Sequence, residues 1–339
     1  MSPLDQMGAT TVAAQPVSSA AVSISIIIPA LNEERIIGRC LESLAKLAFS
    51  RDRFEVLVVD NGSRDKTLEI AESFQDRLNL KVLQKANVPI SALRNLGARA
   101  AAGDILAFLD ADCLAPEDWL DRIFELARAD GAGVMGAHYL LPEDSTWVGK
   151  TWHRYQEAPK SGEVSHVPAG DLIMRREDFL RLSGFDETIQ TNEDYELCER
   201  ARKSGMQVRA FPQIGVIHLG TAQNLQVFFR KQAWHGTHVI KVFLRDVLKS
   251  HNRKAVFFAA YTLLSLFAVI FGVVAVIISP KIWWLPVVGF AALCLPPAAL
   301  SARQVLASRR WPDFFPLFAL YLTYGIARAR ALLSIRNFF

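Results

Sequence analysis

The sequence lacks the cysteine pattern of a zinc site and the glycines of a phosphate-binding loop. The four cysteines are scattered along 339 residues without the paired spacing of a zinc site, which predicts reduced thiols. No glycine occurs between Gly8 and Gly38, so no glycine-rich phosphate loop follows the first apolar run. Residues 1–22 lack the basic start and the apolar core of a signal peptide. We expect a disordered N-terminal tail there, with a binding arm as the alternative.

Charge is missing from two long stretches toward the C-terminal end. Residues 255–279 are 25 residues without a charge, and residues 282–302 are 21. Both stretches qualify as spans, because about 20 apolar residues cross a bilayer as a helix. A third run, 314–327, has only 14 uncharged residues, and it can span with help from its flanks or lie at the interface. The sequence therefore predicts a membrane domain with two or three hydrophobic helices over 255–339.

The net charge of +4 divides unevenly between this membrane part and the rest. Residues 255–339 carry seven basic residues and one acid, a sum of +6, which leaves −2 for residues 1–254. Nucleic acid is therefore not an expected partner. Basic residues precede the first span and also fill 303–312, whereas Lys281 alone separates the first two spans. The positive-inside rule then predicts a multi-pass protein of the inner (cytoplasmic) membrane, with residues 1–254 and 303–312 in the cytoplasm.

The stretch 221–254, just before the first span, is predicted to lie at the membrane interface. Within 225–249, apolar pairs and basic residues each recur every four positions, on different faces of a helix. Such an amphipathic helix can lie on a bilayer surface or pack against its own domain.

Residues 23–220 alternate between apolar strands and amphipathic helices. We expect strands at 24–28, 54–59, 80–83 and 104–109, and helices at 33–47, 65–78 and 90–102. Continuously apolar strands are typical of a parallel sheet that is covered by helices on both faces. The pattern predicts an α/β fold with a doubly wound, mostly parallel, Rossmann-like sheet, whose ligands bind at the carboxyl ends of the strands.

Two aspartates, Asp110 and Asp112, directly follow the strand predicted at 104–109. Burying two charges without a partner is costly, so their place beside a buried strand favours a ligand. A hard cation held by a few carboxylates can neutralise a diphosphate. We therefore expect metal or donor binding here, against the alternative of a capped turn.

Four other polar residues have both a structural and a functional interpretation. Asp60 ends the second strand and can stabilise a turn or accept a hydrogen bond from a nucleobase. Arg94 can cap a helix or bind phosphate. Asp194 begins a helix-like stretch, where it can cap the helix or act as a general base at about 2.6–3.2 Å from a hydroxyl. His218 can be a satisfied core histidine or can complete a metal site.

The order of these motifs resembles that of family 2 glycosyltransferases of the GT-A fold, over roughly residues 23–220. The matching pieces, in order, are Ser-Ile-Ile-Ile-Pro-Ala-Leu-Asn-Glu-Glu, Val-Val-Asp-Asn-Gly-Ser-Arg-Asp-Lys-Thr, Ala-Leu-Arg-Asn-Leu-Gly, Phe-Leu-Asp-Ala-Asp, Gly-Phe-Asp-Glu and Glu-Asp-Tyr-Glu-Leu. The resemblance implies a GT-A-type sheet, a nucleotide-sugar donor and Mg²⁺ or Mn²⁺ as cofactor.

The resemblance also implies roles for individual residues. It makes Asp194 the catalytic base and Asp112 the metal ligand, with His218 as a second residue of the metal site. The other candidate substrate-binding residues are Pro29, Ala30, Glu33, Asp60, Arg94, Asp110 and Glu193. Gly170-Asp171 departs from the Gly-Asn that many relatives have near the acceptor, so the resemblance does not imply the acceptor.

Processive members of this family carry Gln-x-x-Arg-Trp before their membrane helices. Here Ala233 stands before Trp234 in place of the arginine, and Arg230 is not the required glutamine, which favours a single transfer over polymerisation. We expect an inverting, metal-dependent sugar transfer to a hydroxyl of a lipid or lipid-linked acceptor at the cytoplasmic membrane face. Two alternatives stay open: a sugar-phosphate nucleotidyltransferase, and a non-catalytic, membrane-tethered binding protein on the same scaffold.

Overall fold

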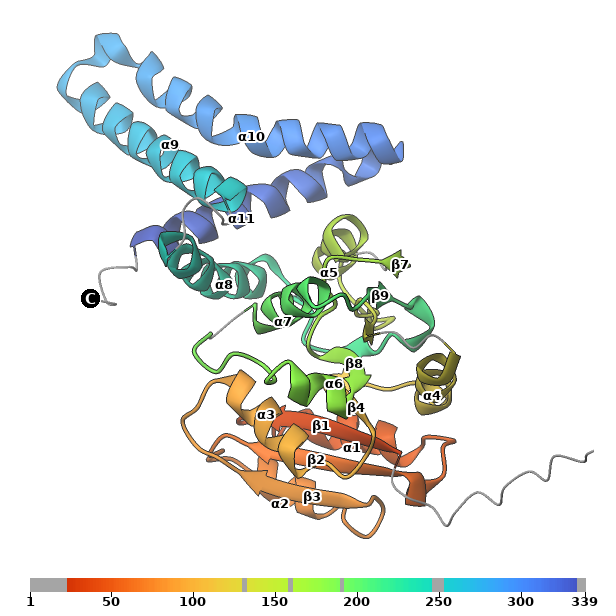
Figure 1. Ribbon diagram of the computed structural model, residues 1–339. Coiled ribbons are helices and arrows are strands. Elements are labelled where there is room, and N and C mark those ends of the chain that lie inside the picture. The colour runs from red at the N-terminus through yellow and green to blue at the C-terminus, as the bar shows by residue number, and fades with distance from the viewer. Residues whose placement is uncertain (1–22, 130–132, 158–160, 190–191, 246–252, 334–339) are drawn as a thin grey trace, which may run out of the picture.

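The computed structural model describes residues 23–333 except 130–132, 158–160, 190–191 and 246–252, and it contains a sheet-based part and a helical part (Figure 1). The tail predicted at 1–22 lies outside the described residues. In the sheet-based part, helices cover both faces of a central sheet, and the site described below lies at one edge of that sheet.

The strands form one large sheet and one small ladder. Their bounds are β1 Ile24–Ala30, β2 Phe54–Asp60, β3 Leu80–Gln84, β4 Ile105–Leu109, β5 Cys113–Leu114, β6 Val134–Gly136, β7 Gly162–Glu163, β8 Asp171–Arg175, β9 Val208–Ala210 and β10 Ile217–His218. Among the described residues the large sheet has eight strands in the order β3-β2-β1-β4-β8-β6-β9-β7, and β5 pairs separately with β10. Only β7 and β8 run against the other six. The predicted mostly parallel sheet is therefore confirmed.

The helices of the sheet-based part divide between the two faces of the sheet. Their bounds are α1 Ile37–Ala45, α2 Thr67–Glu72, α3 Ile90–Ala100, α4 Trp119–Ala129, α5 Trp147–Trp152, α6 Arg176–Arg181 and α7 Glu193–Lys203. Successive residues of a strand point to opposite faces. In β1, Ile26 and Ile28 belong to the core that α1 and α4 cover, whereas Ile27 belongs to the core that α3 and α7 cover.

Two elements differ from their predicted bounds for identifiable reasons. The first strand continues past Ile28 through Pro29, because its pairing with β4 stops at Ile27 and only β2 pairs with it beyond that residue. Proline cannot donate a ladder hydrogen bond, so it is tolerated where one side of the strand has no partner strand. The helix predicted at 65–78 ends at Glu72, and the chain continues in tight turns with hydrogen bonds from residue i+3 to residue i.

The helical part follows the sheet in the chain. Its bounds are α8 Leu225–Arg245, α9 Arg253–Ile278, α10 Trp284–Ser308 and α11 Phe314–Leu333. Figure 1 shows α9 and α10 as a hairpin that extends away from the sheet. Within the described residues, the helical segments 253–278 and 280–308 are long and apolar enough to cross a membrane, and an 18-residue stretch in each has a mean hydropathy of 2.7 and 1.8, respectively. Apolar side chains such as Phe271 and Ile277 are exposed on them.

The third predicted run, 314–327, forms the first part of α11. This helix packs against α8, α9 and α10, and it is not one of the two candidate spans. Leu320 is buried in a cluster with Val148, Ala222 and Phe228, so α11 packs against the sheet-based part. The side chains of 237–245 lie outside the described residues, so the membrane-surface role of α8 stays a prediction.

Candidate active site

The two aspartates that follow β4 contact different partners. The Oδ1 atom of Asp110 lies 2.7 Å from Arg94 Nη2, and its Oδ2 atom accepts a hydrogen bond of 2.9 Å from the Tyr139 hydroxyl. The Oδ2 atom of Asp112 lies 3.2 Å from His218 Nε2, at the end of β10. The Asp-x-Asp pair therefore divides between a buried network and a carboxylate–imidazole pair.

Arg94 connects the end of β4 to the start of α7. Its side chain is 3% exposed, and Nη1 lies 2.6 Å from Glu193 Oε1 while Nη2 contacts Asp110. Burial disfavours the guanidinium charge, but the two carboxylates outweigh that effect and raise the pKa of Arg94. Arg94 thus forms ion pairs with two acids at once in this structure. Its predicted contact with substrate stays a prediction.

Asp194 lies in the first turn of α7, next to Glu193. Its Oδ1 atom accepts a 2.7 Å hydrogen bond from the Tyr195 backbone N–H, and its Oδ2 atom accepts one of 3.2 Å from the Ala169 N–H. Burial is the main cause that raises the pKa of Asp194, and the negative charge of Asp110 adds to it. The two N–H donors and Arg94 act in the opposite direction without cancelling the rise. A carboxylate with a raised pKa is a stronger proton acceptor.

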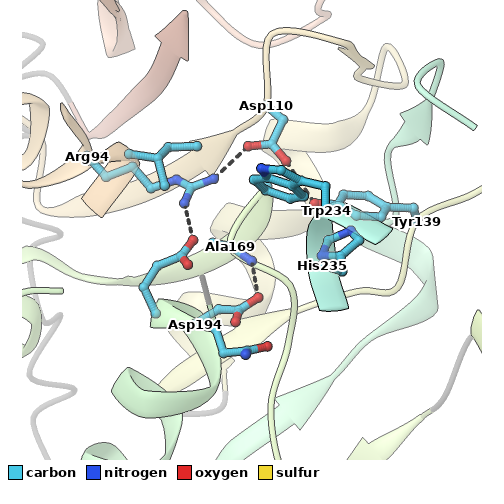
Figure 2. A pocket seen from close by; sticks show the side chains of 11 residues that line it. Arg94, Asp110, Tyr139, Ala169, Asp194, Trp234 and His235 are labelled. Atoms are coloured by element: carbon cyan, nitrogen blue, oxygen red, sulfur yellow. Dashed lines mark hydrogen bonds and ion pairs between the residues drawn. The ribbon is translucent and has the colours of Figure 1, made fainter. Parts of the chain in front are cut away.

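One cavity of about 250 Å³ brings four predicted residues together: Arg94, Asp110, Glu193 and Asp194 (Figure 2). The other lining residues are Ile90, Tyr139, Ala169, Gly170, Asn192, Trp234 and His235. Gly170 lies so close to Asp110 and Tyr139 that a Cβ atom at this position would overlap both side chains. A ligand can therefore lie against the Asp110 carboxylate and the Asp194 carboxylate at once.

The pair of Asp112 and His218 does not line this cavity. The β5–β10 ladder positions the pair, because His218 is opposite Cys113 in it. A Cβ atom at Gly220 would overlap the Asp112 carboxylate, so a side chain at this position would require that carboxylate to move. Lys231 of α8 donates a hydrogen bond to the Gly220 carbonyl oxygen. Burial opposes ionisation of Asp112, but His218 and Lys231 lower its pKa.

Negative charge is concentrated around Asp112. Burial, followed by the charges of Asp112, Asp65 and Asp110, raises the pKa of Glu33 to about 7, and Lys231 offsets only part of this rise. Such crowding of carboxylates favours a bound cation. One carboxylate and one imidazole suit Mn²⁺ or Mg²⁺ when oxygen atoms of a ligand complete the set. In the described parts of the chain, no three His, Cys, Asp or Glu side chains are grouped to hold a metal ion by themselves.

The ends of β1 and β2 lie side by side next to these acids. Pro29 and Ala30 pair with Val59 and Asp60. The Oδ2 atom of Asp60 accepts hydrogen bonds from the turn that follows, at 2.8 Å from Gly62 N and 3.0 Å from Ser63 N. Its Oδ1 atom is buried and has no hydrogen-bond partner among the described residues. Asp60 therefore stabilises a turn, and its predicted contact with a nucleobase stays a prediction.

Three residues at the site, Tyr139, Lys231 and His235, were not predicted from the sequence. Tyr139 holds Asp110 and stacks on His218 at 4.6 Å between ring centroids, but no pattern around it signals these contacts. Lys231 and His235 belong to α8, which the sequence indicated only as an amphipathic helix near the membrane. The aromatic and basic residues of 230–235 were the available signal, because they interrupt an otherwise regular apolar face.

The comparisons with known proteins show the family of the chain. The model of the glycosyl transferase family 2 matches residues 25–182. Glycosyltransferase AglE of Haloferax volcanii is 38% identical over 229 residues, which cover 66% of this chain and 75% of AglE. The chain belongs to glycosyl transferase family 2. Another relative in the comparison, the validoxylamine A glucosyltransferase of Streptomyces hygroscopicus subsp. limoneus, is 28% identical over 219 residues. These residues cover 54% of this chain and 48% of that enzyme.

A solved structure supports the fold of this family 2 member. The mannosyltransferase PcManGT from Pyrobaculum calidifontis, solved in complex with GDP-Man and Mn²⁺, superposes with a TM-score of 0.59. The alignment covers 93% of this chain and 88% of PcManGT at 20% identity, which is evidence for the fold alone. The predicted GT-A-type fold and the enzyme class, a nucleotide-sugar-dependent glycosyltransferase, are confirmed. The nucleotidyltransferase and the non-catalytic binding protein are set aside.

Replacing Arg94 with Gln should destabilise the protein strongly. The change leaves Asp110 and Glu193 without their shared cation, and breaking a buried ion pair in this way lowers the free energy of unfolding by about 3–5 kcal/mol. Chemical denaturation of the purified full chain in detergent measures the effect. Arg99→Gln is the matched control, since Arg99 lies on the same helix, is about half exposed, and pairs with Glu187 at 3.7 Å. Equal stability losses in the two variants would contradict the bracing role.

Proposed function

We propose that this enzyme transfers a sugar from a nucleoside diphosphate donor to a hydroxyl of a lipid or lipid-linked acceptor, with inversion at the anomeric carbon. The observation that carries the proposal is the shared cavity of Asp110 and Asp194, in which the pKa of Asp194 is raised. A proton acceptor and a donor-side carboxylate around one small space are what a direct displacement requires. The departures from the processive motif at Arg230 and Ala233 favour a single transfer.

Asp194 is the proposed general base. It removes the proton of the acceptor hydroxyl as that oxygen attacks the anomeric carbon from the side opposite the leaving diphosphate. The N–H groups of Ala169 and Tyr195 fix the direction of its carboxylate. Such proton transfer contributes roughly 10²–10⁴-fold, and the correct placement of donor and acceptor contributes a large further share.

Donor binding is assigned to the carboxyl ends of β1, β2 and β4. Pro29, Ala30 and Glu33 follow or end β1, and Asp60 has a buried oxygen that can accept a hydrogen bond from a nucleobase. Asp110 then contacts the donor near its ribose, in the position that Arg94 and Tyr139 fix. Glu193 acts on the substrate mainly through this network, because its carboxylate is engaged with Arg94.

Asp112 and His218 are the residues that would hold Mg²⁺ or Mn²⁺. When bound, such a cation neutralises the charge that develops on the departing nucleoside diphosphate. The crowding of Glu33, Asp65, Asp110 and Asp112 supports a cation at this place. The presence of Mn²⁺ in the PcManGT structure is consistent with the same choice.

The acceptor class and the location follow from the helical part. The candidate spans within 253–278 and 280–308 would anchor the enzyme in a membrane, with α11 holding the active site close to its surface. The basic residues that flank the spans favour a cytoplasmic active site, as the positive-inside rule predicts. A lipid or lipid-linked acceptor is the class of molecule that such an anchor brings within reach.

Replacing Asp194 with Asn should leave donor affinity nearly intact and lower the transfer rate by roughly 10²–10⁴-fold, because the amide cannot accept the proton. Released nucleoside diphosphate measures transfer in a panel of nucleotide sugars with Mn²⁺ and a membrane lipid extract. Glu199→Gln is the control, since Glu199 lies on the same helix in a solvent-exposed pair with Lys203. Transfer at the wild-type rate in Asp194→Asn would exclude Asp194 as the base.

The transfer rate should rise with pH and level off above the raised pKa of Asp194. The base must be ionised, so transfer is lost as the pH falls through that pKa, at a higher pH than an ordinary aspartate near 3.9 would give. The pH profile of kcat/KM measures this break. In Glu33→Gln the break should persist, although the pKa of Glu33 is also raised. Loss of the break in Glu33→Gln would assign it to Glu33 and would contradict its assignment to Asp194.

Replacing Asp112 with Ala should weaken donor binding that depends on a divalent cation. Calorimetric titration of the donor with and without Mn²⁺ measures the cation-dependent share of the affinity. Glu117→Ala is the control, because Glu117 lies in the same segment with its side chain exposed. An unchanged donor affinity in the presence of Mn²⁺ would remove Asp112 from the metal site.

A further inference from the structure

A second cavity, of about 740 Å³, lies between the sheet-based part and the helical part. Side chains from α8, α9, α10 and α11 line it, together with Trp152 at the end of α5. Among the lining residues are the aromatic rings of Phe258 and Tyr324 and the basic side chains of Lys254 and Arg328. The cavity thus combines an apolar wall with positive charge.

Arg328 is a buried cation for which the described residues provide no carboxylate partner. The residue is only 9% exposed, and its Nη2 atom donates a hydrogen bond of 3.0 Å to Gln232 Oε1. Its guanidinium carbon lies 4.9 Å from the centroid of the Tyr324 ring. The Nε and Nη1 atoms are buried without a hydrogen-bond partner, and no carboxylate pairs with Arg328 among the described residues. A buried cation in this state is costly, which indicates that an anion completes the site.

A phosphate group fits this cation best. Arg328 lines the cavity, and a guanidinium offers N–H donors to phosphate oxygens in charge-assisted hydrogen bonds that are strong and directional. Gln232 holds the guanidinium in place from α8, and Lys254 adds a second positive charge at the start of α9. An uncharged ligand would not neutralise the charge of Arg328.

The second cavity adjoins the candidate active site through α8. His235 lines both cavities, Gln232 lines only the second, and Trp234 lines only the first. On the other side, the cavity reaches α9 and α10, whose exposed surfaces are apolar. A ligand with a phosphate at Arg328 would therefore have its apolar chain beside α9 and α10 and its head group on the side of His235, which also lines the candidate active site.

We propose that the second cavity binds the phosphate of a lipid acceptor, with Arg328 as the residue that recognises it. This inference rests on the proposed transfer to a lipid-linked hydroxyl, and it narrows the acceptor class to lipids whose head group contains a phosphate. The sugar-accepting hydroxyl then lies beyond the phosphate, past His235. Specificity comes from the anion at one end and the apolar chain at the other.

Binding of octyl phosphate to the full chain in dodecyl maltoside micelles, which contain no phosphate, tests the proposal by calorimetry. Octyl phosphate should bind, and Arg328→Gln should weaken its binding by roughly 10- to 100-fold through the loss of charge-assisted hydrogen bonds. Arg330→Gln is the matched control, since Arg330 lies on the same helix with an exposed side chain. Its affinity should stay within about twofold of wild type. Equal affinities in the two variants overturn the proposal.

Octanol and inorganic phosphate separate the possible sources of binding. Inorganic phosphate should bind at least about tenfold more weakly than octyl phosphate, because it has no chain to bury. If it binds equally well, the site takes a free anion and the lipid assignment is wrong. Octanol should bind alike to wild type and Arg328→Gln, and a parallel loss of octanol binding would show that the substitution damaged the apolar wall instead.

Thermal unfolding without ligand distinguishes binding from a structural role. Arg328→Met removes an uncompensated buried charge, so its Tm should equal or exceed that of wild type. A Tm lower by several degrees would make Arg328 a structural residue and overturn the proposal. Failure of the proposed function has a different signature: no nucleoside diphosphate is released with any donor and lipid extract, while arginine-dependent octyl phosphate binding persists.

Discussion

The ion pairs of Arg94 are the interaction on which the candidate active site depends. They join Asp110, which directly follows β4, to the first turn of α7, which lies far from it in the sequence. Asp110 also accepts the hydrogen bond from Tyr139, and Glu193 directly precedes Asp194. The same network therefore sets the position of the proposed base and, through the charge of Asp110, its affinity for a proton. Few surface contacts could do both, because solvent would screen them.

The strands and their acidic ends could be predicted from the sequence, whereas the different contacts of Asp110 and Asp112 could not. Continuous β-branched runs such as Ile26–Ile28 are read directly as buried parallel strands. The spacing of Asp110 and Asp112 gives no sign that one meets Arg94 and the other His218, because the short turn before β5 sets their directions. The later strands β6, β7 and β9 have only two or three residues each, too few for a periodic pattern.

The third hydrophobic run shows why composition alone could not assign every helix. Its 14 uncharged residues were compatible with a span or an interfacial helix. In the structure, α11 covers part of the sheet-based part, and Leu320 is buried beside Phe228 of α8. Part of this helix is thus buried against the protein, and only the tertiary contacts show this. The buried Arg328 on the same helix lines the second cavity and contacts Gln232 and Tyr324.

Both aspartates of the Asp-x-Asp pair rest against a glycine whose replacement would displace the carboxylate. Gly170 abuts the Asp110 carboxylate, and Gly220 abuts the Asp112 carboxylate. Any effort to redesign the acceptor preference of this enzyme is therefore restricted in where it can introduce bulk. Bulk at Gly170 would displace Asp110 and the Tyr139 hydroxyl that holds it, and bulk at Gly220 would displace Asp112 from its contact with His218.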